Sequence, residues 1–459
     1  MSSGSLVKTQ RNISSHHHAS VVPHQKLPVE LLAEIFVQCM PSMEFGELTR
    51  AYDMGRDQVF EQGLMYPHLI RARLALVCQA WYTVLYNEPR VWTIMVLRDT
   101  LVAHPETVSL WIKKSMSMPL VVYIPDCRVE LGPDNFLSML RHEMWRMRSL
   151  FWDVFNQTDL SALFPFDVST NAPMLQSLAL LRTHGSIDFS TDLEWGDINC
   201  PELRTLCLCW ANAEMISLTV SPLKNVHHLS IVHHHAEEDD NGIWRFLTLL
   251  EALPNLVSLS WLCNSDFCTR VWVGPRSVVL QSLESITLDV CCKGMMECVL
   301  RSLRVPSLER MVFLSLGGVR SDINTDAMSH SLIQLRHLTL GSMRLWGSVP
   351  PLLGYLKHLE TLIIEKYFDN VDELLIALSS HNHGSSTLCP CLKTLDISDV
   401  VTLSRNVLVD FVQQRVKSDL DDPAPGLVTC LKLSYRADYV EEMCAQLVKT
   451  HSSSILFLD

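Results

Sequence analysis

Histidine and cysteine side chains that could bind a metal ion occur in three short clusters of the 459-residue chain. Residues 16–18 and 233–235 are runs of adjacent histidines, the second followed by the acidic segment 237–240, and Cys389 and Cys391 flank a proline. Adjacent histidines on one loop cannot normally all face one ion, and no cluster has the Cys-x-x-Cys or His-Glu-x-x-His spacing of a zinc site. We therefore interpret the histidine runs as solvated loops and expect no bound metal.

Patterns of catalytic residues are also lacking. Gly317 and Gly318 stand alone, not in a glycine-rich loop that cradles phosphates, and no nucleophile elbow appears. An enzyme with an unrecognised site would need a cleft of ionisable groups with perturbed pKa values, which a sequence does not reveal. We expect no catalytic residue, no cofactor and no enzymatic activity.

Composition and charge exclude several further classes. Hydrophobic residues make up 48% of the chain and charged residues 19%, so most of it can fold around a large core, unlike a disordered or collagen-like protein. The net charge of −13 repels phosphate backbones, and no basic patch offsets it. We therefore expect no nucleic-acid partner.

The 15 cysteines are scattered and often lie in apolar stretches, which is typical of reduced thiols in the cytosol or nucleus. The most apolar long window, residues 243–263, is interrupted by Arg245, Glu251 and Pro254, so we expect no membrane association. Residues 1–23 lack acidic side chains and resemble a transit peptide only weakly. We interpret them as a disordered tail and predict a cytoplasmic or nuclear protein.

A repeated sequence phrase covers about two thirds of the chain and must position most of its side chains. An apolar residue, two free positions, a second apolar residue, one free position and a third apolar residue recur at intervals of about 28 residues, which is typical of leucine-rich repeats. The eleven copies begin at Met147, Leu175, Leu203, Val226, Leu256, Leu283, Leu308, Leu335, Leu359, Leu392 and Val428. Met311 could instead begin a copy, so the local register stays open.

Each copy predicts one short strand, because its second and third apolar residues alternate as strand residues do. Helical spacing of apolar residues between the copies predicts an outer, convex layer. These predicted helices are 244–253, 295–303, 371–379 and 406–416. The fold class is therefore α/β, a solenoid over residues 146–459 whose first strand needs a cap.

Residues 24–97 do not repeat and predict three helices, at about 28–39, 68–76 and 78–86. Pro28 and Glu30 are favoured at a helix start. The first helix carries two adjacent apolar stripes, one through Leu31 and one through Leu32, which is wider than a core-facing side requires. One stripe could face a partner.

Three blocks of this module resemble an F-box: LPVELL at 27–32 with Ile35 and Phe36, VCQAW at 77–81 and PRVW at 89–92. Their order and the separation of the two tryptophans match the family. An insertion at about 41–69 departs from it, where an F-box has a short first turn. Within the linker and capping segment 98–145, residues 111–124 resemble the helix and strand that follow the F-box in many fungal F-box proteins with leucine-rich repeats.

The resemblance implies a non-catalytic substrate receptor. The F-box would dock on a Skp-type adaptor, and through it on the cullin of an SCF-type ubiquitin ligase, while the repeats hold an unidentified target protein. The residues matched to the adaptor interface are Leu27, Pro28, Leu31, Ile35, Phe36, Val77, Trp81 and Trp92. The last three have core packing as an alternative role. A protein-interaction scaffold that assembles no ligase is the alternative function.

The target should bind on the concave face, where strands expose side chains over a long surface. One column of inward-facing positions predicts an apolar stripe, and a large exposed apolar patch usually marks a binding site. The stripe consists of Leu181, Cys209, Val232 and Leu262, with Asp289 and Glu365 as acidic contacts farther along. Alternatively, a loop or the chain's own tail covers it.

Overall fold

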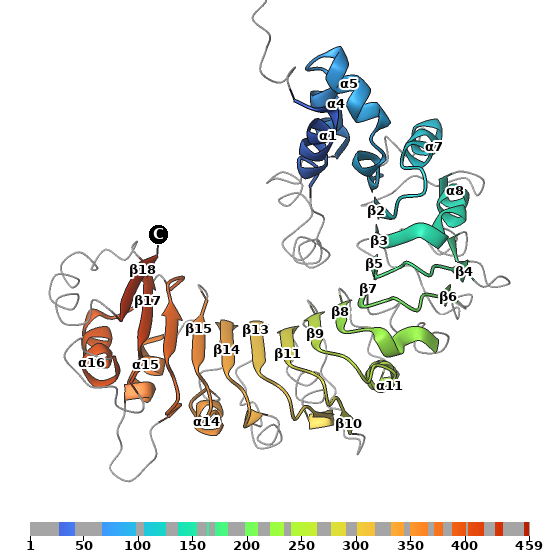
Figure 1. Ribbon diagram of the computed structural model, residues 1–459. Coiled ribbons are helices and arrows are strands. Elements are labelled where there is room, and N and C mark those ends of the chain that lie inside the picture. Colours follow the sequence, from blue (N-terminus) through green and yellow to red (C-terminus); the bar gives the residue numbers. More distant parts are fainter. Residues whose placement is uncertain are drawn as a thin grey trace, which may run out of the picture.

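Within the residues that the computed structural model describes, fourteen parallel strands form one curved sheet, and the eleven copies of the apolar phrase supply eleven of them. The described ranges are 27–41, 67–97, 105–124, 136–153, 163–164, 170–181, 198–209, 221–233, 240–263, 277–290, 301–316, 332–343, 349–365, 371–379, 388–400, 403–416, 427–434 and 454–458. The strands follow one another in chain order across the sheet, and Figure 1 shows them along the inside of an arc.

The strand bounds are β1 (Ile94–Val96), β2 (Leu120–Ile124), β3 (Met147–Asp153), β5 (Ser177–Leu181), β7 (Thr205–Cys209), β8 (His228–His233), β9 (Ser258–Cys263), β11 (Ser285–Val290), β13 (Arg310–Leu316), β14 (His337–Met343), β15 (Thr361–Ile364), β16 (Thr394–Ile397), β17 (Cys430–Ser434) and β18 (Ile455–Leu458). Two short parallel pairs lie apart from this sheet. They are β4 (Thr170–Asn171) with β6 (Ile198–Asn199), and β10 (Val278–Val279) with β12 (Leu303–Arg304).

Strand pairing confirms the register of the repeated phrase. The second apolar residue of each copy pairs with its counterpart in the next, from Leu150 with Leu178 to Leu395 with Leu431. Met311 lies between Ile286 and Leu338, so it is the second apolar residue of the copy that begins at Leu308. The alternative register is therefore wrong.

The core lies between the sheet and an outer layer of helices. The second and third apolar residues of the copies are buried there, and they include the large aromatic side chains of Trp152 and Trp261. Phe246 packs against Trp261 with 4.8 Å between the ring centroids. Because each helix covers only neighbouring strands, the core extends along the sheet as it does in other repeat arrays.

Among the described residues, six helices lie on the outer side of the arc, as Figure 1 shows. They are α7 (Pro105–Lys114), α8 (Phe136–His142), α11 (Asp240–Glu251), α14 (Val349–Tyr355), α15 (Val371–Ser379) and α16 (Arg405–Arg415), with short 3-10 turns η3 (Met144–Arg146) and η4 (Ser221–Asn225). Helices α15 and α16 lie where the spacing predicts them, and α11 begins four residues earlier than predicted. Most of the helix predicted at 295–303 lies outside the described residues.

The described part of the N-terminal module contains three helices and a 3-10 turn. They are α1 (Val29–Gln38), α4 (Pro67–Ala75), α5 (Gln79–Asn87) and η2 (Pro89–Trp92). Phe36 of α1 packs on Trp81 of α5 with 5.1 Å between the ring centroids, and Trp92 Nε1 donates to the Leu85 carbonyl at 3.0 Å. These contacts hold α1, α5 and η2 together.

The sheet starts earlier and ends later than the copies of the phrase. β1 begins at Ile94, directly after the helical module, and β2 comes from the segment expected to cap the array. Both pair in parallel with the strand that follows, and β18 extends the other end. No strand was predicted at β1, because three apolar residues in a row do not distinguish a strand from other buried segments.

Candidate functional site

Helix α1 has two apolar sides, and only one of them is buried. Leu32 and Phe36 face the core, whereas Leu31 is 54% exposed and Ile35, four residues later, is 43% exposed. Residues four apart lie on the same side of a helix. The second stripe that the sequence predicts is therefore open to solvent.

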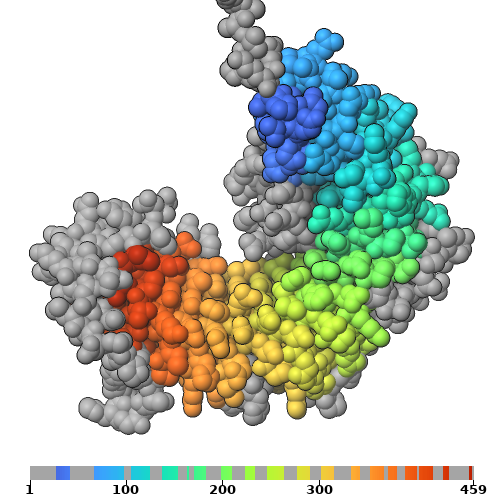
Figure 2. Space-filling model, in the orientation of Figure 1, coloured from blue at the N-terminus to red at the C-terminus, as the bar shows by residue number. Residues whose placement is uncertain are grey.

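A second group of exposed apolar side chains lies at the connection between α4 and α5 and on α5 itself. Leu76 is 85% exposed, and Val77 and Tyr82 are about half exposed. Clusters of exposed apolar side chains usually mark interaction sites. We use the term N-terminal apolar surface for Leu27, Val29, Leu31, Ile35, Leu76, Val77 and Tyr82. Figure 2 shows the residues around α1, in the deepest blue, at the surface of one end of the arc.

The eight residues matched to an adaptor interface divide into two groups. Leu27, Pro28, Leu31, Ile35 and Val77 are exposed. Trp81 is half-buried, and Trp92 is buried with its ring nitrogen engaged by Leu85. Phe36 is fully buried against Trp81, because it lies four residues after Leu32 on the side of α1 that faces α5. Its assignment at or near the adaptor interface stays a prediction.

Arg90 links α1 to η2 at the edge of this surface, a contact that sequence analysis did not find. Its guanidinium contacts the Glu34 carboxylate at 2.7 Å and the Glu88 carboxylate at 2.8 Å. Hydrogen bonds from Arg90 hold the pKa of both carboxyl groups below their usual range. Because these groups are largely solvated, the pairs orient the helix ends more than they stabilise the fold.

The apolar stripe predicted on the concave face exists, but it is buried. Leu181 is 0%, Val232 3% and Leu262 6% exposed, so the stripe is not an open surface in this structure. It belongs to a second apolar cluster on the inner side of the sheet that also contains Val96, Tyr123, Phe151, Ala179 and Cys207. The side chain of Cys209 lies outside the described residues. The prediction that this stripe is exposed is therefore wrong for Leu181, Val232 and Leu262.

Beyond this cluster the inner face becomes acidic. Burial raises the pKa of Asp289 to about 6, and one of its carboxylate oxygens is buried without a hydrogen-bond partner among the described residues. Burial, helped by the charges of Asp399 and Asp289, also raises the pKa of Glu365. On the next strands, Lys432 pairs with Asp396 at 3.1 Å. The charge of Asp289 thus contributes to the raised pKa of Glu365.

The raised pKa of Asp289 predicts that the stability of the fold depends on pH. Its pKa rises from 3.8 to about 6 on folding, so the folded state binds the proton more tightly than the unfolded state does. The folded state therefore loses stability as the pH rises from about 4 to about 6, where the carboxyl group becomes charged. We expect Asp289→Asn to raise the melting temperature at pH 7.5 and to have no such effect at pH 4. Calorimetry at both pH values, with the exposed Asp410→Asn as control, tests this. An equal gain at both would contradict it.

The candidate metal ligands give no site in the described part of the chain. There, no group of three or more His, Cys, Asp or Glu side chains is arranged to hold a metal ion. Residues 16–18 and 234–235 lie outside the described ranges. Cys389 is buried, which raises the pKa of its thiol to about 12, whereas Cys391 is exposed. Among the described helices, none has the length and hydropathy needed to span a membrane.

Comparisons with known proteins give little beyond the fold. No family model matches the sequence, and no curated protein matches it. One similar solved structure is the crystal structure of a TLR13–ssRNA13 complex, with 16% identity, a TM-score of 0.31 and coverage of 62% of this chain and 41% of that chain. The repeated phrase and the long parallel sheet decide the fold class. The fold is that of a leucine-rich-repeat solenoid. Such a repeat domain is suited to binding other proteins.

Proposed function

We propose that this chain is a non-catalytic substrate receptor of a cullin–RING (SCF-type) ubiquitin ligase. Its N-terminal module acts as an F-box that docks on a Skp-type adaptor, and its solenoid binds the protein to be ubiquitinated. The exposed apolar stripe of α1 carries this proposal. Leu31 and Ile35 belong to the first F-box-like block and are open to a partner, while Leu32 and Phe36 pack the module.

The place of the module in the fold supports the proposal. Figure 1 shows α1, α4 and α5 at one end of the arc, next to β2, with which β1 pairs. Because η2 leads directly into β1, the module is continuous with the sheet. An adaptor on α1 and a target on the repeats would therefore occupy different parts of one connected body. The receptor would accelerate ubiquitination by holding a target lysine near the conjugating enzyme, which is catalysis by proximity.

The described inner face offers acidic rather than apolar contacts to a target. The apolar cluster around Leu181 is covered, whereas Asp289, Glu365 and Asp399 lie in the acidic region beyond it. We propose this region as part of the target-binding surface. The reduced state of the described cysteines agrees with a cytoplasmic or nuclear protein.

The test is adaptor binding by variants of the exposed stripe. We expect the full chain to co-elute with a co-expressed Skp-type adaptor in size-exclusion chromatography. Leu31→Asp with Ile35→Asp should weaken binding at least about tenfold, because each places a charge in an apolar interface. Ile376→Asp on α15, which is equally exposed, is the matched control and should bind as the wild type does.

The two candidate functions give different results. Co-elution of wild type that is lost in a folded double variant supports the F-box assignment. Co-purification of a cullin then supports the ligase role, whereas adaptor binding without a cullin supports a non-ligase scaffold. A folded wild type that ignores the adaptor would overturn the F-box assignment and leave an interaction scaffold that uses only the repeats.

A further inference from the structure

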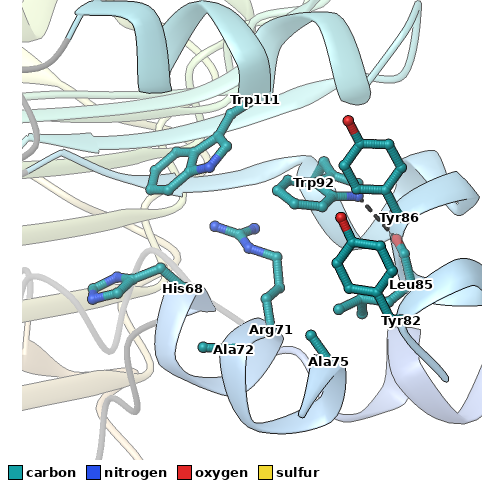
Figure 3. Close-up of a pocket in the computed structure, with 9 residues that line it drawn as sticks. All are labelled: His68, Arg71, Ala72, Ala75, Tyr82, Leu85, Tyr86, Trp92 and Trp111. Atoms are coloured by element: carbon teal, nitrogen blue, oxygen red, sulfur yellow. Dashed lines mark hydrogen bonds between the residues drawn. The ribbon is translucent and has the colours of Figure 1, made fainter. Parts of the chain in front are cut away.

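A small aromatic cavity lies where the N-terminal module meets the first outer helix of the solenoid. Its volume is about 240 Å³, and residues from α4, α5, η2 and α7 line it. The rings of Tyr82, Tyr86, Trp92 and Trp111 make up most of the wall, as Figure 3 shows. Ligand sites are typically concave, mostly apolar and equipped with few polar groups. The cavity therefore has the character of a small-molecule site.

Arg71 is the charged group of this cavity. Only 3% of the residue is exposed, and its guanidinium carbon lies 5.0 Å from the Trp92 ring and 4.7 Å from the Trp111 ring. Figure 3 shows the guanidinium extending from α4 into the space between these two rings. Burial lowers the pKa of Arg71 to about 10, which still leaves it positively charged at neutral pH.

Only part of the hydrogen-bonding capacity of Arg71 is used. Nη1 donates to the carbonyls of Val91 at 2.9 Å and Ile94 at 3.2 Å. Nη2 is buried and has no hydrogen-bond partner in the described part of the chain. A buried donor without an acceptor destabilises the fold, and more so when it is charged. An acceptor at Nη2, above all an anionic one, would remove this cost.

Arg146 is a buried arginine of this fold whose three nitrogens all have hydrogen-bond partners. Its Nε donates to the Glu143 carboxylate at 2.6 Å, Nη1 to Ser115 Oγ at 3.0 Å, and Nη2 to the Ile112 carbonyl at 3.2 Å. Arg146 thus has an acidic partner and uses all three nitrogens. Arg71 differs, because among the described residues no carboxylate pairs with it, and burial lowers its pKa.

We propose that this cavity binds the carboxylate of a small aromatic acid. The carboxylate would accept a charge-assisted hydrogen bond from Arg71 Nη2, and the flat body would pack against the tyrosine and tryptophan rings. Trp92 cannot serve as the donor, because its Nε1 already donates to Leu85. Lys114, whose Nζ lies 3.1 Å from the centre of the Tyr86 ring, adds a second positive charge beside the wall. This site does not depend on the proposed F-box role.

Direct binding to the full chain tests the proposal. Benzoate and phenylacetate are the probes, benzyl alcohol is their uncharged control, and inorganic phosphate tests for a simple anion site. Saturation-transfer NMR titrations measure the dissociation constants. We expect saturable binding of an aromatic acid and at least about tenfold weaker binding of benzyl alcohol, as expected for the loss of a charged hydrogen bond.

Two variants assign the binding to this cavity. Arg71→Gln removes the charge and should weaken benzoate binding at least about tenfold. Since Arg71 also bonds Val91 and Ile94, that variant can lose its fold, so Ala72→Leu provides an independent test. Ala72 lines the cavity on an exposed side of α4, and a larger side chain there should block the ligand while leaving Arg71 in place. Arg148→Gln, at an exposed arginine on β3, is the control.

Loss of benzoate binding in folded Ala72→Leu, with binding intact in Arg148→Gln, would support the site. The proposal is overturned if no aromatic acid binds saturably, if benzyl alcohol or phosphate binds as well as benzoate, or if folded Arg71→Gln and Ala72→Leu bind benzoate as the wild type does.

Discussion

Replacing Gly341 with alanine will destabilise the solenoid by about 3 kcal/mol or more, because a methyl group has no room there. A Cβ on Gly341 of β14 would lie 2.1 Å from the carbonyl oxygen of Leu314 on β13 and 2.8 Å from its carbonyl carbon. Both atoms are backbone, so relief requires β13 and β14 to separate. These strands pair on either side of this point, through Phe313 with Leu340 and Ser315 with Ser342.

Gly354 provides the matched control for this prediction. It lies on α14, and a Cβ there would meet only Leu388 Cδ2 at 3.9 Å, an ordinary contact distance. Alanine is a better helix former than glycine, so Gly354→Ala should stabilise the protein by about 0.5 kcal/mol. Thermal unfolding followed by circular dichroism should show a lower melting temperature for Gly341→Ala and a higher one for Gly354→Ala. Hydrogen exchange should show that the amides of β13 and β14 lose protection in Gly341→Ala. Equal stability of the two variants would show that β13 moves freely.

Replacing Arg146 with methionine will destabilise the junction of the first repeats by about 3 kcal/mol. Methionine preserves much of the side-chain volume, so the loss comes from hydrogen bonds. Arg146 donates to the carbonyls of Met118 at 2.8 Å and Ile112 at 3.2 Å, and it pairs with the Glu143 carboxylate at 2.6 Å. Its removal leaves these acceptors in a largely apolar environment, because Arg146 itself is 1% exposed.

Arg148 is the control two residues away. Its side chain is exposed and donates only to Gln176 Oε1, at 3.1 Å. Arg148→Met should change the free energy of unfolding by less than about 0.5 kcal/mol. Because repeats contact mainly their neighbours, hydrogen exchange should increase in β2 and β3 of Arg146→Met and stay unchanged near β16. A uniform increase along the whole solenoid would contradict a local role.

The register of the repeats was predictable because the same spacing of apolar residues recurs in every copy. Every copy needs a second and a third apolar residue to face the same core, and the strands pair in that register from Leu150 to Leu431. Only the choice at Met311 needed the structure, which placed it beside Ile286 and Leu338. Two registers of apolar residues were possible there, and only the pairing with the neighbouring strands decides between them.

Exposure was less predictable than pattern. The two stripes of α1 are alike in composition, yet Phe36 is buried against Trp81 whereas Ile35 is 43% exposed, because α5 packs on one stripe only. The concave stripe shows the reverse case. Its apolar residues were identified correctly, but Leu181, Val232 and Leu262 are buried, since long-range packing decides which face of a sheet meets water.

The cavity around Arg71 had no signal in the sequence. Its lining comes from α4, α5, η2 and α7, which are separated in the chain. An arginine in a helix that contains both polar and apolar residues is usually exposed to solvent. By itself, the sequence determined the α/β repeat architecture and the position of the N-terminal helices, because periodic apolar spacing and helix-start residues act locally. Only the tertiary structure decided which apolar faces stay open and which charges are buried, because these depend on contacts between segments far apart in the chain.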